Sequence, residues 1–399
     1  MKNFGKNTML EFDDAFEIVM RSAHLLSTEH VGIDRALNRV LAEDVASDID
    51  VPPFNKSAMD GFACRRANLV NELAIVETIP AGYMPEKTIG QNQCAKIMTG
   101  AVVPEGADCV IMVEYTEQLS EQTIRFIGSE TSDNICSKAE DIKAGDIMIC
   151  RGTRIRPEHI AVLASVGCVT PLVSRQPKVA IIATGNELVE PAVRPGNSQI
   201  RNSNSYQLAA QLIEVGAIPN YYGIAADTEL VIDSILKEAI ADSDVVLLSG
   251  GVSMGDFDLV PKMLRENNIE LVFEKVAIKP GKPTVFGISD GVFCFGLPGN
   301  PVSTFVIFEI LVKPFLCRMM GHEFKPLTIP MPLEKTISRK RSERMSWIPV
   351  AFTNNSGVTP VDYHGSAHIN ALCGADGLIS IPVGVAEIKE GTSVAVRQI

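Results

Sequence analysis

The sequence predicts a multidomain chain that combines one doubly wound α/β domain with two small β domains. Its 399 residues exceed what one hydrophobic core usually holds, so we expect about two to four domains. From Lys178 onward, apolar runs alternate with helical stretches, which is typical of a largely parallel sheet covered by helices on both faces. The segment 51–146 and the segment from Lys325 onward instead hold short β-branched runs between turn residues, without a long helical period.

The first 45 residues carry a helical pattern. Phe12, Phe16 and Val19 fall on one face of a helix, and residues 34–45, "DRALNRVLAEDV", repeat this spacing of apolar side chains. We therefore expect two helices before the first β segment begins.

The second half should alternate between helices and strands. A helix is expected to begin at Pro157, because proline suits the first turn, and to end before Gly167. The later expected helices are 205–215, 228–241, 259–266 and 301–320, and the expected strands are "VAIIATG", "YYGIA", "DVVLLSGG", "ELVFEKVAI", "TVFG" and "GVFCFGLPGN".

Charge and hydropathy exclude several classes of partner. The formal net charge of -12 repels polyanions, so we expect no binding to nucleic acid or to an anionic membrane. No apolar run approaches the roughly 18 residues of a membrane span, and the first residues, "MKNFGK", lack the apolar stretch of a signal peptide. Any anionic ligand therefore has to be held by a local cluster of cations.

Cysteine and histidine spacing gives no support for a metal cluster or for covalent catalysis. The nine cysteines are odd in number and never occur as C-x-x-C, and the six histidines show no H-E-x-x-H. No Ser-His-Asp or Cys-His order can be recognised. We expect a reduced cytoplasmic protein.

Glycines and carboxylates follow several of the predicted parallel strands. The strand exits read "ATGNE", "AAD", "SGGVSMGDFD" and "LPGNP", and such exits meet at one edge of a doubly wound sheet. Glu187, Asp227 and Asp258 would repel a phosphate there unless a divalent cation lay between them, and Mg²⁺ accepts this combination of ligands. The alternative is that the acids cap helices, which applies above all to Asp227 and Asp256.

A lysine-rich segment predicts an oxyanion site near the same edge. In "KVAIKPGKP" two prolines hold the chain extended, and Lys275, Lys279 and Lys282 bring up to three ammonium groups together. A solvated lysine face is the alternative for such a charge run. Asn300 before Pro301 fits a helix N-cap, and the helix amino terminus behind it attracts anions.

Seven blocks give the chain a strong resemblance to the molybdopterin molybdenumtransferase family, the MoeA-type enzymes that also form the E domain of gephyrin. They are "PPFNKSAMDGFA", "IMTGAVVPEGAD", "AEDIKAGD", "ATGNEL", "SGGVSMGDFD", "AIKPGKP" and "FGLPGNPVST". They occur in the family's order and cover almost the whole chain.

The resemblance implies insertion of molybdate into adenylylated molybdopterin, with AMP released and Mg²⁺ required, by an elongated homodimer whose site is shared between subunits. It also implies an α/β domain similar to molybdopterin adenylyltransferases, one of which is a possible partner, and a mixed helical linker domain. The implied domains are a linker of 27–45 and 147–175, a small β domain of 46–146, an α/β domain of 1–26 and 176–327, and a C-terminal β-barrel-like domain of 328–399.

The family's functional positions can be transferred to matching residues. The resemblance implies that the glycine turn, Ser249 to Gly255, and Asn300 bind the pterin and its phosphates. It also implies that Ser253, Lys279 and Lys282 hold molybdate or the pyrophosphate bridge. Glu187, Asp227 and Asp258 would then place Mg²⁺ and the hydrolysed phosphate. The implied catalytic residues are Asp60, Thr99, Glu187, Asp227, Asp258, Lys279 and Lys282, with the metal on Glu187, Asp227 and Asp258. The implied substrate-binding residues are Asp141, Thr184, Gly185, Ser249, Gly250, Gly251, Ser253, Gly255, Lys275, Pro298, Gly299, Asn300, Pro301 and Ser366.

Two departures from the family pattern concern anion contacts. Family members often carry arginines before the "ED" block, whereas this chain has Cys136, Ser137 and only one cation, Lys138. In the last domain an arginine usually precedes an apolar strand, but "WIPVAF" around Val350 has none, and Arg344 is the nearest.

Two other functions remain open at this point. The α/β segment alone fits a molybdopterin adenylyltransferase, although the β domains with "SAMDG" and "MTG" argue against that activity. The same fold also fits a non-catalytic scaffold, although the acids and lysines argue against it.

Overall fold

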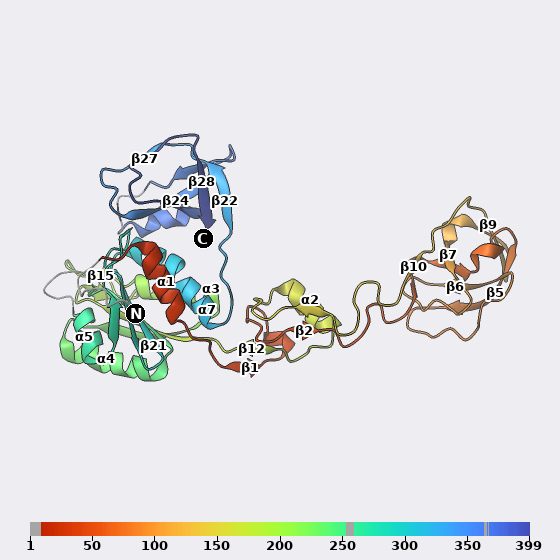
Figure 1. Cartoon of the computed structure of the whole chain (residues 1–399), viewed down its shortest axis with the longest axis horizontal. Coiled ribbons are helices and arrows are strands. Elements are labelled where there is room, and N and C mark those ends of the chain that lie inside the picture. Colours follow the sequence, from red (N-terminus) through yellow and green to blue (C-terminus); the bar gives the residue numbers. More distant parts are fainter. Residues whose placement is uncertain (1–8, 253–258, 363–364, 366) are drawn as a thin grey trace.

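A computed structural model describes residues 9–252, 259–362, 365 and 367–399 of the chain. The molecule is elongated, with an α/β unit and a C-terminal sheet at one end and a separate β-sheet at the other (Figure 1). A thin middle segment connects the two ends. Within the described residues, no helix has the length and apolar character that crossing a membrane requires.

The α/β unit is built on a six-stranded sheet in the order β16-β13-β17-β21-β20-β18. The first four strands are parallel, while β20 and β18 are antiparallel to their neighbours. The strands are β13 (Lys178–Thr184), β16 (Ile218–Ala225), β17 (Val245–Ser249), β18 (Glu270–Phe273), β20 (Val285–Ser289) and β21 (Val292–Leu297), and a short parallel pair, β14 (Leu188–Val189) and β15 (Ile200–Arg201), lies beside them. The doubly wound sheet is therefore confirmed.

Helices cover both faces of this sheet, which explains why its central strands are apolar throughout. Val179 and Ile181 of β13 pack in one core with α1, α3, α6 and α7, while Ala180 and Ile182 pack in a second core with α4 and α5. The helices are α1 (Phe12–Ser22), α3 (Asn204–Val215), α4 (Glu229–Asp242), α5 (Val260–Glu266), α6 (Pro301–Ile307) and α7 (Lys313–Met319). A π-helical turn, Phe308–Val312, joins α6 to α7 within the predicted final helix.

Two element predictions are wrong. Residues 34–45 form a short 3-10 turn, Ile33–Arg35, and extended bridges instead of a helix, because Val40 and Leu41 pair with distant backbone. Tertiary pairing overrides the helical spacing there. The run "ELVFEKVAI" is also not one strand: β18 ends at Phe273, and the later β19 (Ile278–Lys279) joins another sheet.

The middle segment is small and contains its own buried cluster. It holds α2 (Pro157–Ser165), which ends before Gly167 with φ of +75°, as predicted. Its strand pairs are β1 (Thr28–His30) with β12 (Leu172–Ser174) and β2 (Val45–Ala46) with β11 (Ile147–Ile149).

The distal sheet has the order β7-β4-β6-β5-β9-β8 and lies far from the α/β unit (Figure 1). Its strands are β4 (Gly61–Cys64), β5 (Glu72–Ile79), β6 (Gln93–Ile97), β7 (Cys109–Met112), β8 (Thr116–Ser120) and β9 (Thr123–Phe126), with 3-10 turns at Arg66–Asn68 and Val113–Tyr115 and a pair β3 (Lys56–Ser57) and β10 (Ile135–Cys136) nearby. It confirms a β domain in this part of the chain.

The C-terminal sheet has the order β19-β24-β26-β28-β22. Its strands are β22 (Thr328–Pro332), β24 (Met345–Phe352), β25 (Val358–Pro360), β26 (Gly377–Ile381) and β28 (Ser393–Gln398), with a pair β23 (Ile337–Ser338) and β27 (Glu387–Ile388) and a 3-10 turn at Ile369–Gly374. Its edge strand β19 comes from the α/β segment, with Ile278 opposite Met345 and Lys279 opposite Ser346. The lysine segment therefore joins the two units. The domain borders given above stay predictions.

Candidate active site

The exits of three parallel strands pack against one another at one edge of the sheet. β13 ends at Thr184, and the turn after β17 follows with Gly250 and Gly251, whose φ angles are +100° and +61°. A methyl group on Gly250 would lie 2.5 Å from the Thr184 carbonyl oxygen, so only glycine fits here. After β21, a methyl group on Gly299 would lie 3.7 Å from the Gly250 Cα atom. Most of the predicted glycine-turn residues are thus brought together.

One side chain that the sequence analysis did not select ties two of these exits together. Asn204, the first residue of α3, donates from Nδ2 to Ser249 Oγ and to the Gly299 carbonyl oxygen, each at 2.8 Å. Its Oδ1 is buried without a partner among the described residues, and so is Thr184 Oγ1. The signal for it, a polar run "RNSNS" ahead of a helix, looks the same as ordinary helix capping.

Glu187 and Asp227 are the two predicted metal ligands that lie within the described residues, and both lie beside the turn after β13. Asp227 Oδ2 accepts a hydrogen bond from the Asn186 backbone N–H, and Asn186 Oδ1 accepts one from the Asp227 N–H, both at 3.1 Å. Asp227 thus bonds the neighbouring turn, and α4 has no side-chain cap. Glu187 is exposed and makes no ion pair within the described residues, and a methyl group on Gly185 would lie 2.5 Å from its Oε2.

These acids offer a suitable donor set for magnesium, although the described residues alone do not complete it. Mg²⁺ binds through one or two carboxylates plus phosphate oxygens, and Glu187 and Asp227 supply two carboxylates at adjacent strand exits. Among the described residues, no group of three His, Cys, Asp or Glu side chains is close enough to hold a metal. The third predicted ligand, Asp258, lies outside the described residues, as do Asp256, Ser253, Gly255 and Ser366.

A cationic cavity lies next to the edge of the sheet where Gly250, Gly251 and Gly299 meet, which we call the glycine rim. Its volume is about 540 Å³, and none of the described residues that line it is a carboxylate; they are Lys279, Pro280, Gly281, Lys282, Pro283, Pro298, Asn300, Ser303, Arg344 and Gly365. Both Lys279 and Lys282 are exposed and make no ion pair within the described part of the chain. Two of the three predicted lysines therefore meet there, whereas Lys275 is not a lining residue and its carbonyl accepts from the Leu10 N–H at 3.1 Å.

Short polar contacts hold the cavity wall in place. Gly281, at φ of +107°, shapes the lysine turn, and the buried Thr284 hydroxyl donates to its carbonyl oxygen at 2.7 Å. Asn300 precedes α6, but its side chain makes no capping bond. The Thr304 hydroxyl instead bonds the Pro298 carbonyl at 2.5 Å and the Asn300 carbonyl at 3.2 Å. The Asn300 side chain is therefore not consumed by the helix.

Arg344 supplies the third cation of this cavity. It donates from Nη1 to the Ile278 carbonyl at 3.2 Å, across the junction between the two sheets. Arg339 supports it from behind, because its guanidinium donates to the Arg344 carbonyl at 2.8 Å and to Ser346 Oγ at 2.7 Å. "WIPVAF" lacks an arginine, yet the cavity has one from the preceding loop.

The remaining predicted residues lie at the distal end. Asp60 Oδ1 accepts from the Thr99 backbone N–H at 2.7 Å and from its hydroxyl at 3.1 Å, so these two residues meet. Asp141 is exposed on the connection back to the middle segment, and Lys138 pairs with Asp50 at 3.3 Å. Within one chain, none of them approaches the lysine cavity, because the two units lie at opposite ends (Figure 1).

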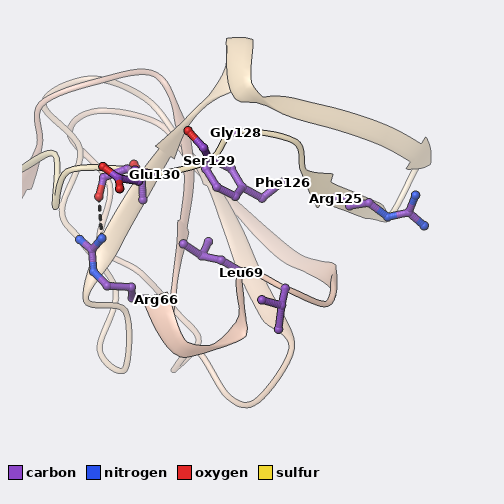
Figure 2. A pocket seen from close by; sticks show the side chains of 9 residues that line it. Arg66, Leu69, Arg125, Phe126, Gly128, Ser129 and Glu130 are labelled. Atoms are coloured by element: carbon purple, nitrogen blue, oxygen red, sulfur yellow. Dashed lines mark hydrogen bonds between the residues drawn. The ribbon is translucent and has the colours of Figure 1, made fainter.

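A second cavity, of about 670 Å³, lies on the distal sheet (Figure 2). Arg66 and Arg125 lie on opposite sides of it, with Leu69 and Phe126 between them. Both guanidiniums are already engaged: Arg66 pairs with Asp133 and donates to the Thr131 carbonyl, and Arg125 pairs with Glu72. Unlike the lysine cavity, this one offers no arginine or lysine without a partner among its described lining residues.

Protein-family models match the chain in sequence order. Residues 10–167 match the MoeA N-terminal region (domain I and II), residues 180–318 a probable molybdopterin binding domain, and residues 335–399 the MoeA C-terminal region (domain IV). The molybdopterin molybdenumtransferase of Staphylococcus epidermidis is 35% identical over 404 residues, which cover 98% of this chain and 96% of that protein. The chain belongs to the molybdopterin molybdenumtransferase family.

Further comparisons agree with this membership. The molybdopterin molybdenumtransferase of Bacillus subtilis is 34% identical, over 98% of this chain and 94% of that one. A crystal structure of the molybdopterin biosynthesis MoeA protein from Pyrococcus horikoshii has a TM-score of 0.83 at 31% identity, covering 98% of this chain and 99% of that one. The chain is thus a transferase of molybdenum cofactor biosynthesis, which confirms the predicted family, fold class and enzyme class.

Within this molybdenumtransferase, the matched binding domain holds both the glycine rim and the lysine turn. Arg344 comes from the matched C-terminal region, so the cavity combines residues of two matched regions. Asp60, Thr99 and Asp141 belong to the matched N-terminal region.

Proposed function

We propose that this protein inserts molybdate into adenylylated molybdopterin, with release of AMP, in a reaction that requires Mg²⁺. The observation that carries the proposal is the lysine cavity, where Lys279, Lys282 and Arg344 converge without a carboxylate or an ion partner in the described residues. In a protein of net charge -12, such a local cluster of cations is what can hold an anionic ligand against the repulsion of the overall charge. Molybdate is a dianion, and the cavity of about 540 Å³ has room for it.

The pterin substrate is proposed to lie on the glycine rim beside this cavity. Asn300 lines the cavity and the preceding Gly299 packs on Gly250, so the two sites are continuous. Molybdate and the dithiolene group of the pterin would then be held in a reactive arrangement, although both carry negative charge. Lys279 and Lys282 would stabilise the negative charge that develops in the transition state, as preorganised cations do in the active sites of other transferases. No covalent intermediate with the protein is required.

Magnesium is proposed to bind Glu187, Asp227 and Asp258 at the strand exits. When bound, the ion supplies positive charge to the phosphoanhydride oxygens of the substrate. The chain's own contribution is to orient the Asp227 carboxylate, which accepts a hydrogen bond from the Asn186 N–H at 3.1 Å.

We further propose a homodimer with a site shared between subunits. Asp60 and Thr99 form a tight pair on the distal unit, away from the lysine cavity of their own chain. A second copy can present this pair to the cavity, which accounts for how one elongated subunit would use residues at both ends. We place this homodimer in the cytoplasm, with a molybdopterin adenylyltransferase as the partner that supplies its substrate.

Product analysis tests the reaction itself. We expect AMP release from adenylylated molybdopterin to depend on both molybdate and Mg²⁺, and to stop when the metal is chelated. Release of AMP without molybdate would contradict the proposal. Consumption of ATP with unmodified molybdopterin would favour an adenylyltransferase, and absence of pterin binding would favour a scaffold.

Subunit mixing tests the shared site. Asp60→Asn and Lys279→Ala should each lower the activity strongly, because each removes one half of the site. Co-refolding the two variants should restore about a quarter of the activity, because half of the dimers are mixed and each mixed dimer keeps one intact site of two. Absence of any recovery in a mixture shown to contain mixed dimers would refute sharing between subunits.

A further inference from the structure

The amide of Asn204 occupies a junction between two strand exits. Its Nδ2 group lies 2.8 Å from Ser249 Oγ, at the end of β17, and 2.8 Å from the Gly299 carbonyl oxygen, in the loop before α6. The residue is only 8% exposed, and Thr304 Oγ1 lies 3.5 Å from the same nitrogen. One side chain thus connects the glycine turn to the loop that lines the lysine cavity.

The orientation of this amide is determined by its partners. A carbonyl oxygen can only accept, so the NH₂ group and not Oδ1 has to face Gly299. Oδ1 is consequently buried without a partner in the described residues, and Thr184 Oγ1, on the neighbouring strand exit, shares this state. Buried polar atoms without partners are rare in folded proteins, and each needs a reason other than stability.

Backbone contacts also join the two exits, because Ser249 of β17 lies opposite Leu297 of β21. Gly250 faces Gly299 with no side chain between them, and the Gly250 N–H donates to the Leu297 carbonyl at 3.1 Å. Beyond Leu297, the Nδ2 group of Asn204 adds a side-chain link from Ser249 to Gly299, between turn and loop.

We propose that Asn204 is a positioning residue for the pterin substrate. It holds the 249–251 turn and the 298–300 loop at the separation at which the pterin and its phosphates bind. This inference rests on the proposed function and assigns a role that the substrate-contacting residues alone do not explain. The cations proposed to bind molybdate are held by other contacts, through Thr284 and Arg339, so we expect Asn204 to act mainly on the pterin.

The test is a comparison of two Asn→Asp variants. Asn204→Asp keeps the size of the side chain, but the carboxylate cannot donate to the Gly299 carbonyl and repels it. Asn267→Asp is the matched control, because Asn267 also donates from Nδ2 to two oxygens, of Asp233 at 2.8 Å and Met263 at 2.9 Å, outside the glycine rim and the cavity. We expect Asn204→Asp to raise KM for the adenylylated pterin about tenfold, with KM for molybdate changed less than twofold, because a lost hydrogen bond to substrate-binding backbone costs about one order of magnitude.

A measurement that does not depend on turnover separates this inference from the proposed reaction. Hydrogen exchange at the Gly250 N–H should accelerate in Asn204→Asp and stay unchanged in Asn267→Asp. If exchange accelerates in Asn204→Asp but the wild type releases no AMP, the proposed reaction is refuted and the positioning role of Asn204 is kept. If Asn204→Asp does not fold, Asn204→Ala should give the same acceleration and the same KM difference. Unchanged exchange, equal rises in both KM values, or an equal rise in the control would overturn the inference.

Discussion

The amino and carboxyl edges of the parallel sheet differ in whether their charged side chains form ion pairs. At the amino edge, Asp244 receives two hydrogen bonds from Arg175, at 2.7 and 2.6 Å, and a third from the Lys178 N–H at 2.8 Å. At the carboxyl edge, Lys279 and Lys282 have no ionic partner among the described residues. The charges of Arg175 and Asp244 are thus paired at the amino edge, whereas the described residues offer Lys279 and Lys282 no ion pair at the carboxyl edge.

This difference separates stability from function within one sheet. A bidentate pair between β17 and the segment before β13 fixes the strands, because its charges are satisfied and partly shielded from water. The unpaired cations and the orphaned oxygens of Thr184 and Asn204 do not help the fold in this way. Changes at the amino edge should therefore act on stability, and changes at the carboxyl edge on catalysis.

Removing both lysines of the cavity should have the largest effect. In the double variant Lys279→Ala and Lys282→Ala, molybdate-dependent AMP release should fall by about a hundredfold or more, because the oxyanion loses its preorganised charge. The melting temperature should not fall, because no ion pair is lost. The control is Lys335→Ala with Lys389→Ala, two exposed lysines outside the cavity that change the net charge equally. A matching loss of activity in the control would point to overall charge instead of the cavity.

Removing the arginine of the amino edge should affect stability instead. Arg175→Ala leaves the Asp244 carboxylate, whose side chain is 16% exposed, without its partner. We expect a loss of about 2 kcal/mol in the free energy of unfolding, below the usual value for a fully buried pair because the Arg175 side chain is 33% exposed. Denaturant titration measures this, with both KM values expected to stay constant. Arg21→Ala, in the exposed pair with Glu17, should cost almost nothing, and an equal cost there would refute the distinction.

A pH dependence of stability should give the smallest effect. Burial by itself raises the pKa of Asp244, but the hydrogen bonds from Arg175 and the Lys178 N–H outweigh it and hold the pKa below its usual 3.8. A lowered pKa stabilises the fold at pH values above 3.8, and this contribution is lost as pH falls through the folded-state pKa. The stability difference between wild type and Asp244→Asn should thus be constant from about pH 5 to 7 and shrink below about pH 4. A difference that grows on acidification would contradict this.

Most of the α/β half could be predicted from the sequence, for local reasons. The apolar run of β13 is buried on both faces, and Gly250 is needed because its backbone touches Thr184. The second expected helix, 34–45, failed because Val40 and Leu41 pair with backbone far along the chain. The spacing identified Ala36, Val40 and Leu41 as buried, but Leu37 is exposed, and the structure that buries the others could not be read from it.

The candidate site could be predicted in part. Lys279 and Lys282 meet in one cavity, as their spacing and prolines suggested, while Lys275 does not line it. Arg344 could not be placed from the sequence, because its contact with the cavity depends on β19 pairing with β24 of another sheet. The role of Asn204 was hidden, because an asparagine ahead of a helix has the same sequence signal as a simple cap.

The sequence by itself determined the family, the alternating α/β pattern, the glycine turn and the lysines of this protein. Each of these features is specified by residues that are neighbours in the chain. Only the tertiary structure decided which of these groups share a cavity, that Arg344 joins the lysines, and that Asp60 and Thr99 lie at the opposite end of the chain. The physical reason is that these arrangements depend on pairing between segments far apart in the chain. No local period in the sequence specifies such pairing.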